Sequence, residues 1–166
     1  MLTEAPARPE HAALLLASLP PERRRRIQLR SNGSALEALV ADIAASDLSY
    51  CGIVRGARLP DDVRGARLPD DDGDHVVTLG GVMPTGQPEC GYVWQVISDV
   101  RAHKRAYLLQ GREMQARFHR LYRWLVIAVE PENAAALRHL RRLGWREIGA
   151  IEHRGVAARV YQRSGP

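Results

Sequence analysis

A cluster of basic side chains lies at the start of a predicted long helix. Its members are Arg101, His103, Lys104 and Arg105, and the helix is expected over about residues 100–122. A helix N-terminus carries partial positive charge and free backbone N–H groups, so it disfavours cations and attracts anions. The cluster therefore predicts a site for an anionic group such as a phosphate. The alternative is a basic first turn that faces solvent.

The charge of the whole chain is unevenly distributed. The 166 residues include 24 Lys or Arg and 19 Asp or Glu, which gives a net charge of +5. Residues 1–100 carry a net charge of −4, and residues 101–166 carry +9. A basic half suggests an anionic partner, which could be nucleic acid, a phosphorylated cofactor or an acidic protein. Because 23 of the basic residues are arginine, a solvated arginine-rich face typical of a GC-rich genome is the alternative.

Length and composition exclude several classes of protein. The length predicts one domain, and 45% apolar residues exclude a wholly disordered chain. No apolar stretch approaches the ~20 residues of a membrane span, and the first residues do not resemble a secretory signal. Cys51 and Cys90 fit no metal-ligand spacing and are predicted to be free buried thiols. The Asp-rich residues 70–74 lack the spacing of a calcium loop, so we predict no metal site.

Hydrophobic periodicity and turn residues predict a mixed α/β domain. Helices are expected over residues 9–19, 35–46, 100–122 and 133–143. Strands are expected over residues 76–83, 92–97, 125–129, 146–152 and 156–162, with a further short strand over residues 2–4. Ser34 and Glu37 form a capping box, and Gly144 should end the last helix.

Two segments stand apart from this pattern. Arg23 to Arg26 form a run without interleaved aromatic residues, so we interpret it as a solvated helix face. Residues 54–62 read VRGARLPDD, and residues 63–71 repeat these letters without change. The repeat is too short and polar for a solenoid, so residues 54–74 are predicted to be a duplicated polar surface loop within the domain.

The order of elements and several residues resemble the GNAT superfamily, the GCN5-related N-acetyltransferases. Asn133, Ala136 and the sequence Leu143-Gly144-Trp145 match the family's segment after strand five. The segment over residues 96–106 is similar to its cofactor-binding segment, although Lys104 replaces a glycine there. The resemblance implies a single α/β domain, in which about four helices flank a central mixed, mostly antiparallel sheet.

The same resemblance implies a site. Acetyl-CoA or another acyl-CoA would be the cofactor, and the residues expected to bind it are Val96, Ile97, Arg101, His103, Lys104, Arg105, Ala106 and Asn133. Glu89, just before strand four, is the candidate general base, with an ordinary surface glutamate as the alternative. Leu140 occupies the position of the family's proton-donating tyrosine, and its neighbour His139 is the candidate replacement. No Ser-His-Asp or Cys-His spacing specifies a covalent nucleophile.

A narrower resemblance covers residues 76–150. It is to tailed-phage proteins with a GNAT-like fold, first described as internal virion proteins, and it is carried by residues such as Gly91, Trp94, Asp99 and Leu140. It implies a phage protein in the cytoplasm of an infected bacterium or in the virion, with a phage or host protein partner. The chain would acylate an amine of a protein or small molecule, or serve as a catalytically silent scaffold in virion assembly or host takeover. Nucleic-acid binding is a third interpretation, which rests only on the basic half.

Overall fold

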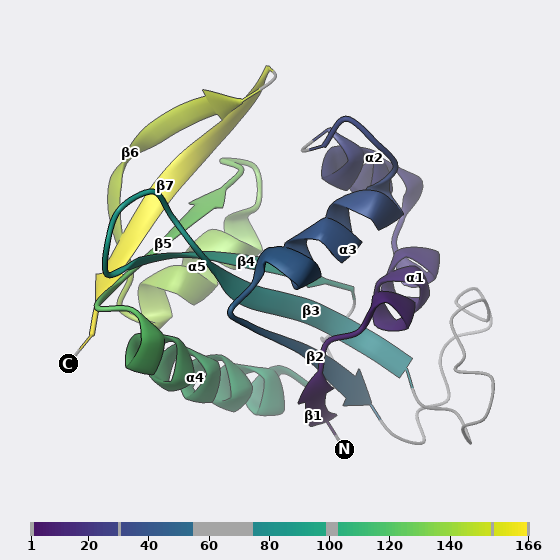
Figure 1. The fold of residues 1–166 in the computed structure, drawn as a ribbon, viewed down its shortest axis with the longest axis horizontal. Helices are drawn as coiled ribbons and strands as arrows, with labels where there is room; N and C mark the ends of the chain where they lie inside the picture. Colours follow the sequence, from purple (N-terminus) through teal and green to yellow (C-terminus); the bar gives the residue numbers. More distant parts are fainter. Residues whose placement is uncertain (1, 30, 55–74, 99–102, 154, 166) are drawn as a thin grey trace.

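The computed structural model describes residues 2–29, 31–54, 75–98, 103–153 and 155–165. In these ranges the chain forms one seven-stranded sheet and five helices (Figure 1). The helices are α1 (Pro9–Ser18), α2 (Pro21–Gln28), α3 (Ala35–Ala45), α4 (Lys104–Leu121) and α5 (Ala134–Arg142). The strands are β1 (Leu2–Pro6), β2 (Leu48–Val54), β3 (His75–Pro84), β4 (Cys90–Ile97), β5 (Trp124–Val129), β6 (Arg146–His153) and β7 (Val156–Ser164). Residues 55–74 of the duplicated segment lie outside the described residues.

The sheet is mixed and mostly antiparallel, as predicted. Its strand order is β1-β2-β3-β4-β5-β7-β6, and only β4 and β5 are parallel neighbours. The predicted hairpin is β3 and β4, which pair from Thr78 opposite Ile97 to Pro84 opposite Gly91. The single parallel contact therefore joins two antiparallel halves of the sheet.

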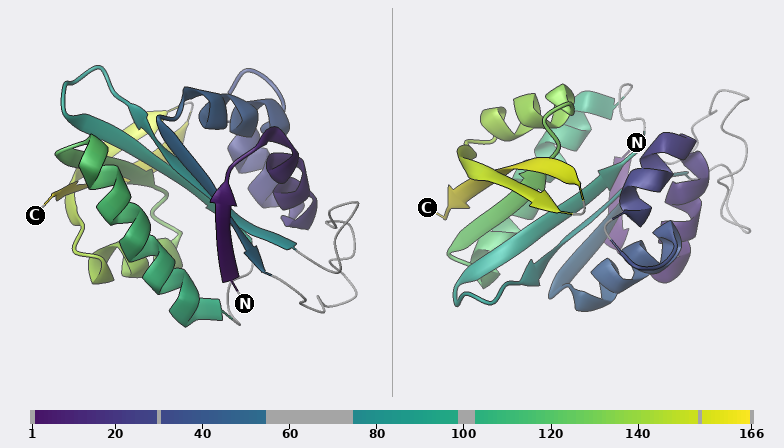
Figure 2. Two further views of the ribbon diagram at one scale, coloured as in Figure 1. Left: turned by 60° about the horizontal axis from the view of Figure 1, so that its bottom comes forward. Right: turned by 90° about the horizontal axis from the view of Figure 1, so that it is seen from above.

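Helices cover both faces of the sheet (Figure 2). The α1, α2 and α3 helices lie on one face, where Leu15 and Leu39 pack in a core with Trp94. The α4 and α5 helices lie on the other face, where Met114 and Phe118 belong to a second core. Neighbouring residues of a strand point to opposite faces, so β4 supplies both cores.

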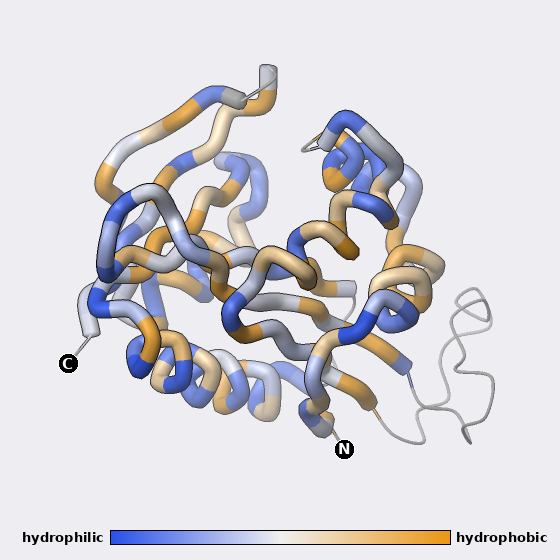
Figure 3. The backbone as a smooth tube through the Cα atoms, in the orientation of Figure 1, coloured by the Kyte–Doolittle hydropathy of each residue, from blue (hydrophilic) through white to orange (hydrophobic). Residues whose placement is uncertain are grey.

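The long helix α4 buries a stripe of its surface. Hydrophobic and hydrophilic segments alternate along it (Figure 3), as expected for a helix with one apolar side. Tyr107, Met114 and Phe118 are the apolar side chains of α4 that this stripe buries. Leu121 is 49% exposed, because the helix ends at this residue and turns toward β5.

The local signals at two helix ends are confirmed. The Ser34 hydroxyl accepts from the Glu37 N–H at 3.2 Å, and the Glu37 carboxylate accepts from the Ser34 N–H at 2.6 Å. Gly144 follows α5 with a φ of +81°, in the left-handed region that glycine tolerates best. Short-range hydrogen bonds and backbone sterics set these features, which is why the sequence predicts them.

Strand β2 was missed by the sequence prediction. Its sequence, LSYCGIV, is short and mixes polar and small residues with apolar ones. It nevertheless lies inside the sheet, paired with β1 on one edge and β3 on the other. Its strand conformation therefore depends on two partners that are distant in sequence, which local periodicity does not reveal.

Candidate functional site

The contact between β4 and β5 is short. The two strands pair at only three positions, Cys90 with Trp124, Gly91 with Leu125 and Tyr92 with Val126. Beyond them β4 continues to Ile97 and β5 to Val129, and the strands run apart (Figure 1). The facing backbone edges of residues 93–97 and 127–129 thus form an open edge inside the sheet. Such an edge can hydrogen-bond an extended, amide-containing ligand.

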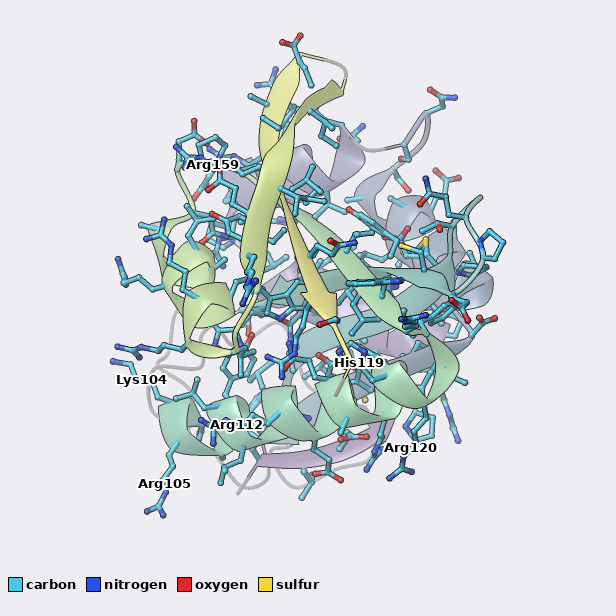
Figure 4. All side chains as sticks on the ribbon, turned by 90° about the vertical axis from the view of Figure 1, so that its left-hand side faces the viewer. Lys104, Arg105, Arg112, His119, Arg120 and Arg159 are labelled. Carbon is cyan, nitrogen blue, oxygen red and sulfur yellow. The ribbon has the colours of Figure 1, made fainter. Side chains whose placement is uncertain are left out.

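The N-terminus of α4 follows β4 in the chain, seven residues after Ile97. Its N-cap residue His103 makes no side-chain capping bond, and the first turn contains no acidic residue. By contrast, Ser34 caps α3 and Asn133 caps α5. Lys104 and Arg105 are exposed at the beginning of α4 (Figure 4). The N-cap side chain of α4 therefore leaves the first N–H groups of the helix without a capping bond from His103, and the turn is basic, which suits an anionic group.

Gln95 connects the open edge to α4. The Tyr107 hydroxyl donates to Gln95 Oε1 at 2.9 Å, while Gln95 Nε2 donates to the Tyr50 hydroxyl at 2.8 Å and to Thr78 Oγ1 at 3.4 Å. Burial raises the pKa of Tyr107 and of Tyr50, so both phenols stay protonated. These hydrogen bonds connect the first turns of α4 to the part of β4 that does not pair with β5.

His139 lies on α5 against α4. Its ring is 5.0 Å from the ring of Tyr107, and it lies beside Gly111. Burial, with a smaller contribution from Arg142, lowers the pKa of His139, which favours the neutral imidazole near pH 7. The structure therefore places the neutral imidazole of His139 against Tyr107, whose hydroxyl donates to Gln95. The neighbouring Leu140 is 6% exposed in the core and has no proton to donate.

Helix α2 contacts the ends of both diverging strands. Arg23 Nη1 donates to the carbonyl oxygen of Ile97, the last residue of β4, at 2.9 Å. Arg26, one turn later, forms an ion pair with Glu130, which directly follows β5. The four arginines of the run are exposed, as predicted for a solvated helix face, and two of them also contact the strand ends. They attach α2 to the ends of β4 and β5 that border the open edge.

The predicted site residues fall into two groups. Val96 and Ile97 lie in the part of β4 that does not pair with β5. The start of α4 holds His103, Lys104, Arg105 and Ala106. Arg101 lies outside the described residues. Asn133 is the N-cap of α5, where its Oδ1 accepts from the Ala136 N–H at 3.1 Å. The structure brings these residues and His139 to the same end of the sheet.

Glu89 lies elsewhere. It occupies the turn before β4 with a φ of 60°, its side chain is 65% exposed, and its carboxylate is 4.0 Å from the Arg123 guanidinium. A strand rises about 3.3 Å per residue, so the length of β4 places Glu89 about 26 Å from Ile97. The structure does not bring Glu89 together with the other predicted site residues.

Several residues at the open edge were not identified from the sequence. They are Gln95, Tyr107, Arg23, Arg26 and Glu130. Tyr107 was interpreted as a packing aromatic, and only the tertiary structure shows that its hydroxyl bonds Gln95. The Glu130-Pro131-Glu132 turn after a buried strand was the one local signal that could have indicated a carboxylate beside the site.

Comparison with known proteins identifies the architecture. Neither a family model nor a curated protein sequence matches the chain. Solved structures do match. A GNAT-family acetyltransferase from Streptococcus pneumoniae is 15% identical over 99% of both chains, with a TM-score of 0.57. Ribosomal-protein-S5-alanine acetyltransferase from Vibrio fischeri is 10% identical over 98% of this chain and 92% of the other, with a TM-score of 0.62. The chain has the GNAT fold.

A third similar structure shows what a protein with this fold can bind. It is an aminoglycoside acetyltransferase in complex with coenzyme A and kanamycin, 9% identical over 99% of this chain and 95% of the other, with a TM-score of 0.63. The GNAT fold expected from the sequence is thereby confirmed. No comparison supports the narrower relation to phage virion proteins. None of the helices that the structure describes is long and apolar enough to span a membrane.

Proposed function

We propose that this GNAT-fold chain binds an acyl-CoA at the open edge between β4 and β5 and transfers the acyl group to an amine. The observation that carries the proposal is that β4 and β5 stop pairing after Tyr92 and Val126, next to a helix that begins with basic residues and receives no capping bond from its N-cap side chain, His103. The edge of β4 that β5 leaves uncovered, over residues 93–97, is suited to amide groups of the ligand. The first turn of α4, with Lys104 and Arg105, is suited to its phosphates.

The residues present can assist the transfer. A bound acyl-CoA supplies a thioester carbonyl, which an amine attacks to form a C–N bond as the C–S bond breaks. The amine must lose a proton and the thiolate must gain one. Glu130 lies at the open edge, but its ion pair with Arg26 orients its carboxylate toward α2. We assign Glu130 to attraction of the positively charged acceptor, and neutral His139 to proton transfer.

Glu89 remains a second candidate base. Its exposed position before β4 makes it less suited than His139, because proton transfer requires hydrogen-bond reach or one bridging water. An acceptor amine that binds at the open edge would have to extend along most of β4 to reach Glu89. Replacing Glu89 with glutamine should therefore leave the rate of acyl transfer within about twofold of the unchanged protein.

Calorimetric titration with acetyl-CoA tests the cofactor site. We expect binding by the unchanged protein and weaker binding by K104A/R105A, by about tenfold or more, since each lost charge-assisted contact costs ~1.5 kcal/mol. The matched control is R24A/R138A, which removes two exposed cations from α2 and α5. No binding at millimolar acetyl-CoA would refute the proposal, and equal losses in both variants would refute the assignment to α4.

The silent scaffold is the second candidate function, in phage virion assembly or host takeover through a protein partner. Two departures from the family motif favour it. Lys104 stands where the cofactor loop has a glycine, and the buried Leu140 stands where the proton-donating tyrosine is expected. Transfer of labelled acetyl groups from acetyl-CoA to lysate proteins or polyamines separates the two functions. Binding without transfer would favour the scaffold, and its protein partner would then be sought directly.

A further inference from the structure

A second concave surface lies at the other end of α4. It is a groove with a volume of about 1140 Å³. The groove lies between the C-terminal half of α4, the end of α5, the start of β5 and the end of β7. Five arginines from these elements line it, namely Arg112, Arg120, Arg123, Arg142 and Arg163, and the one carboxylate among its lining residues is Glu89. Its positive charge is thus drawn from four parts of the sequence.

This arginine groove is separate from the proposed acyl-CoA site. A helix rises 1.5 Å per residue, so Arg120 lies about 24 Å along α4 from Lys104. Figure 4 shows Lys104 and Arg105 at one end of α4 and His119 and Arg120 at the other. A ligand in the groove and an anion at the N-terminus of α4 would therefore be bound independently.

The charge of the arginine groove is almost uncompensated. Over the ranges that the structure describes, Arg112, Arg120, Arg142 and Arg163 form no ion pair. Arg123 is 4.0 Å from Glu89 and also lies over the Trp124 ring, 5.8 Å from its centroid. Like charges gathered in a concave site repel one another and raise the local concentration of anions. The uncompensated positive charge of the groove therefore favours the binding of an anion.

Buried polar groups lie at the lining of the groove without partners. Gln115 is 7% exposed, and its Nε2 donates no hydrogen bond within the described residues. The Nε of Arg163 and the Nε2 of His119 are likewise buried without partners there. Leaving a buried donor unpaired costs about 1–3 kcal/mol. A ligand with acceptor oxygens would satisfy Gln115 and Arg163.

Arg163 is held in place by a glycine. A Cβ on Gly144 would lie 2.8 Å from Arg163 Nη1, so the guanidinium occupies the space that any other residue would fill. Arg142, two residues earlier, lines the same groove from the last turn of α5. The end of α5 therefore both supplies one arginine and positions another.

We propose that the arginine groove binds a small anion with at least two adjacent phosphate groups. The planar guanidinium fork matches phosphate oxygens bidentately, and several such forks in one bounded groove suit neighbouring phosphates better than a single carboxylate. A volume of about 1140 Å³ is that of a small-molecule site. Binding of an extended nucleic acid would instead need a longer basic surface with several aromatic side chains on which bases stack.

Calorimetric titration with inorganic pyrophosphate and with ADP tests this site. Both titrations use protein that carries K104A/R105A, which removes the basic side chains at the N-terminus of α4, and no coenzyme A is added because its own pyrophosphate would compete for the groove. We expect both probes to bind this protein with one site, and the variants below are made in the same background. The R112A/R142A variant removes two exposed arginines of the groove and should bind at least about tenfold more weakly. The control R24A/R138A removes the same charge elsewhere and should bind as the K104A/R105A protein does.

Each result of these titrations supports or overturns the proposal that the arginine groove binds adjacent phosphate groups. Pyrophosphate binding equal to that of ADP would mean that inorganic polyphosphate suffices, whereas tighter ADP binding would add a nucleoside contact. No binding of pyrophosphate, or equal losses in R112A/R142A and R24A/R138A, would overturn the proposal. So would preferred binding of single-stranded oligonucleotides with affinity that grows with their length.

Discussion

Arg26 on α2 forms an ion pair with Glu130 at the end of β5. Together with the bond from Arg23 to the Ile97 carbonyl oxygen, it holds α2 against the ends of the two strands that diverge. The side chain of Glu130 is 17% exposed and that of Arg26 is 50% exposed, so the pair is partly screened by solvent. These two arginine contacts add to the burial of Ile27 in the core, which also holds α2 in place.

Releasing α2 is expected to affect local motion more than global stability. The Arg26→Ala variant loses a partly exposed ion pair worth up to about 1 kcal/mol. We expect a small change in the free energy of unfolding but faster amide hydrogen exchange in α2. Hydrogen-exchange mass spectrometry measures this, with Arg159→Ala, which breaks the exposed pair with Glu147 at 3.3 Å, as the control. Unchanged exchange in α2 would show that the ion pair does not hold the helix.

Removing the Gln95 side chain should destabilise the fold. Gln95→Ala leaves the buried hydroxyls of Tyr50 and Tyr107 without their common partner. An unfolding free energy lower by about 2–3 kcal/mol is expected from urea titration. Tyr107→Phe removes one hydroxyl and should cost less, about 1 kcal/mol, although it leaves Gln95 Oε1 unpaired. A cost for Gln95→Ala below that of Tyr107→Phe would contradict the central role of Gln95.

Gly144 should tolerate no side chain. Its φ is +81°, and an added Cβ would lie 2.8 Å from Arg163 Nη1. Gly144→Ala is expected to lower the free energy of unfolding by about 1–2 kcal/mol from backbone strain. It should also weaken anion binding in the arginine groove, because Arg163 must move. The control is Gly149→Ala in β6, where a Cβ meets nothing within 4 Å and a small effect is expected.

Stability should fall as the pH is lowered through the range of histidine titration. The pKa of His139 is lowered, mainly by burial, and the same cause lowers the pKa of His11 and of His119. In the unfolded chain these imidazoles take up protons near their usual pKa of 6.5, whereas the folded protein resists protonation. Their contribution is therefore fully present above the unfolded pKa and is lost as the pH falls through and below about 6.5.

Thermal unfolding between pH 8 and pH 5 measures this dependence. His139→Gln removes one of the responsible groups and should reduce the slope of the melting temperature with pH. His103→Gln changes a half-buried histidine at the N-cap of α4 and serves as the comparison. A slope unaffected by His139→Gln would show that burial of this imidazole does not contribute to the pH dependence.

The site could be predicted from the sequence only in part. The basic start of α4 and the cap at Asn133 were identifiable, because both depend on residues within one or two turns of a helix. Glu89 was chosen for its closeness to β4 in the sequence, yet the length of the strand separates it from the open edge. A solvated arginine-rich face was one interpretation of the basic half of the chain, yet two arginines of α4, Arg112 and Arg120, line the arginine groove.

The sequence by itself determined four of the five described helices, most strands, the caps of α3 and α5 and the strongly basic second half, since hydrophobic periodicity and short-range hydrogen bonds act over a few residues. Only the tertiary structure decided that β2 lies inside the sheet and that β4 and β5 part after three pairs. It also decided that Arg23 and Arg26 contact the strand ends, and that five arginines from separate elements converge on one groove. Each of these relationships joins residues distant in the chain, and their energies arise only when the sheet and helices pack together.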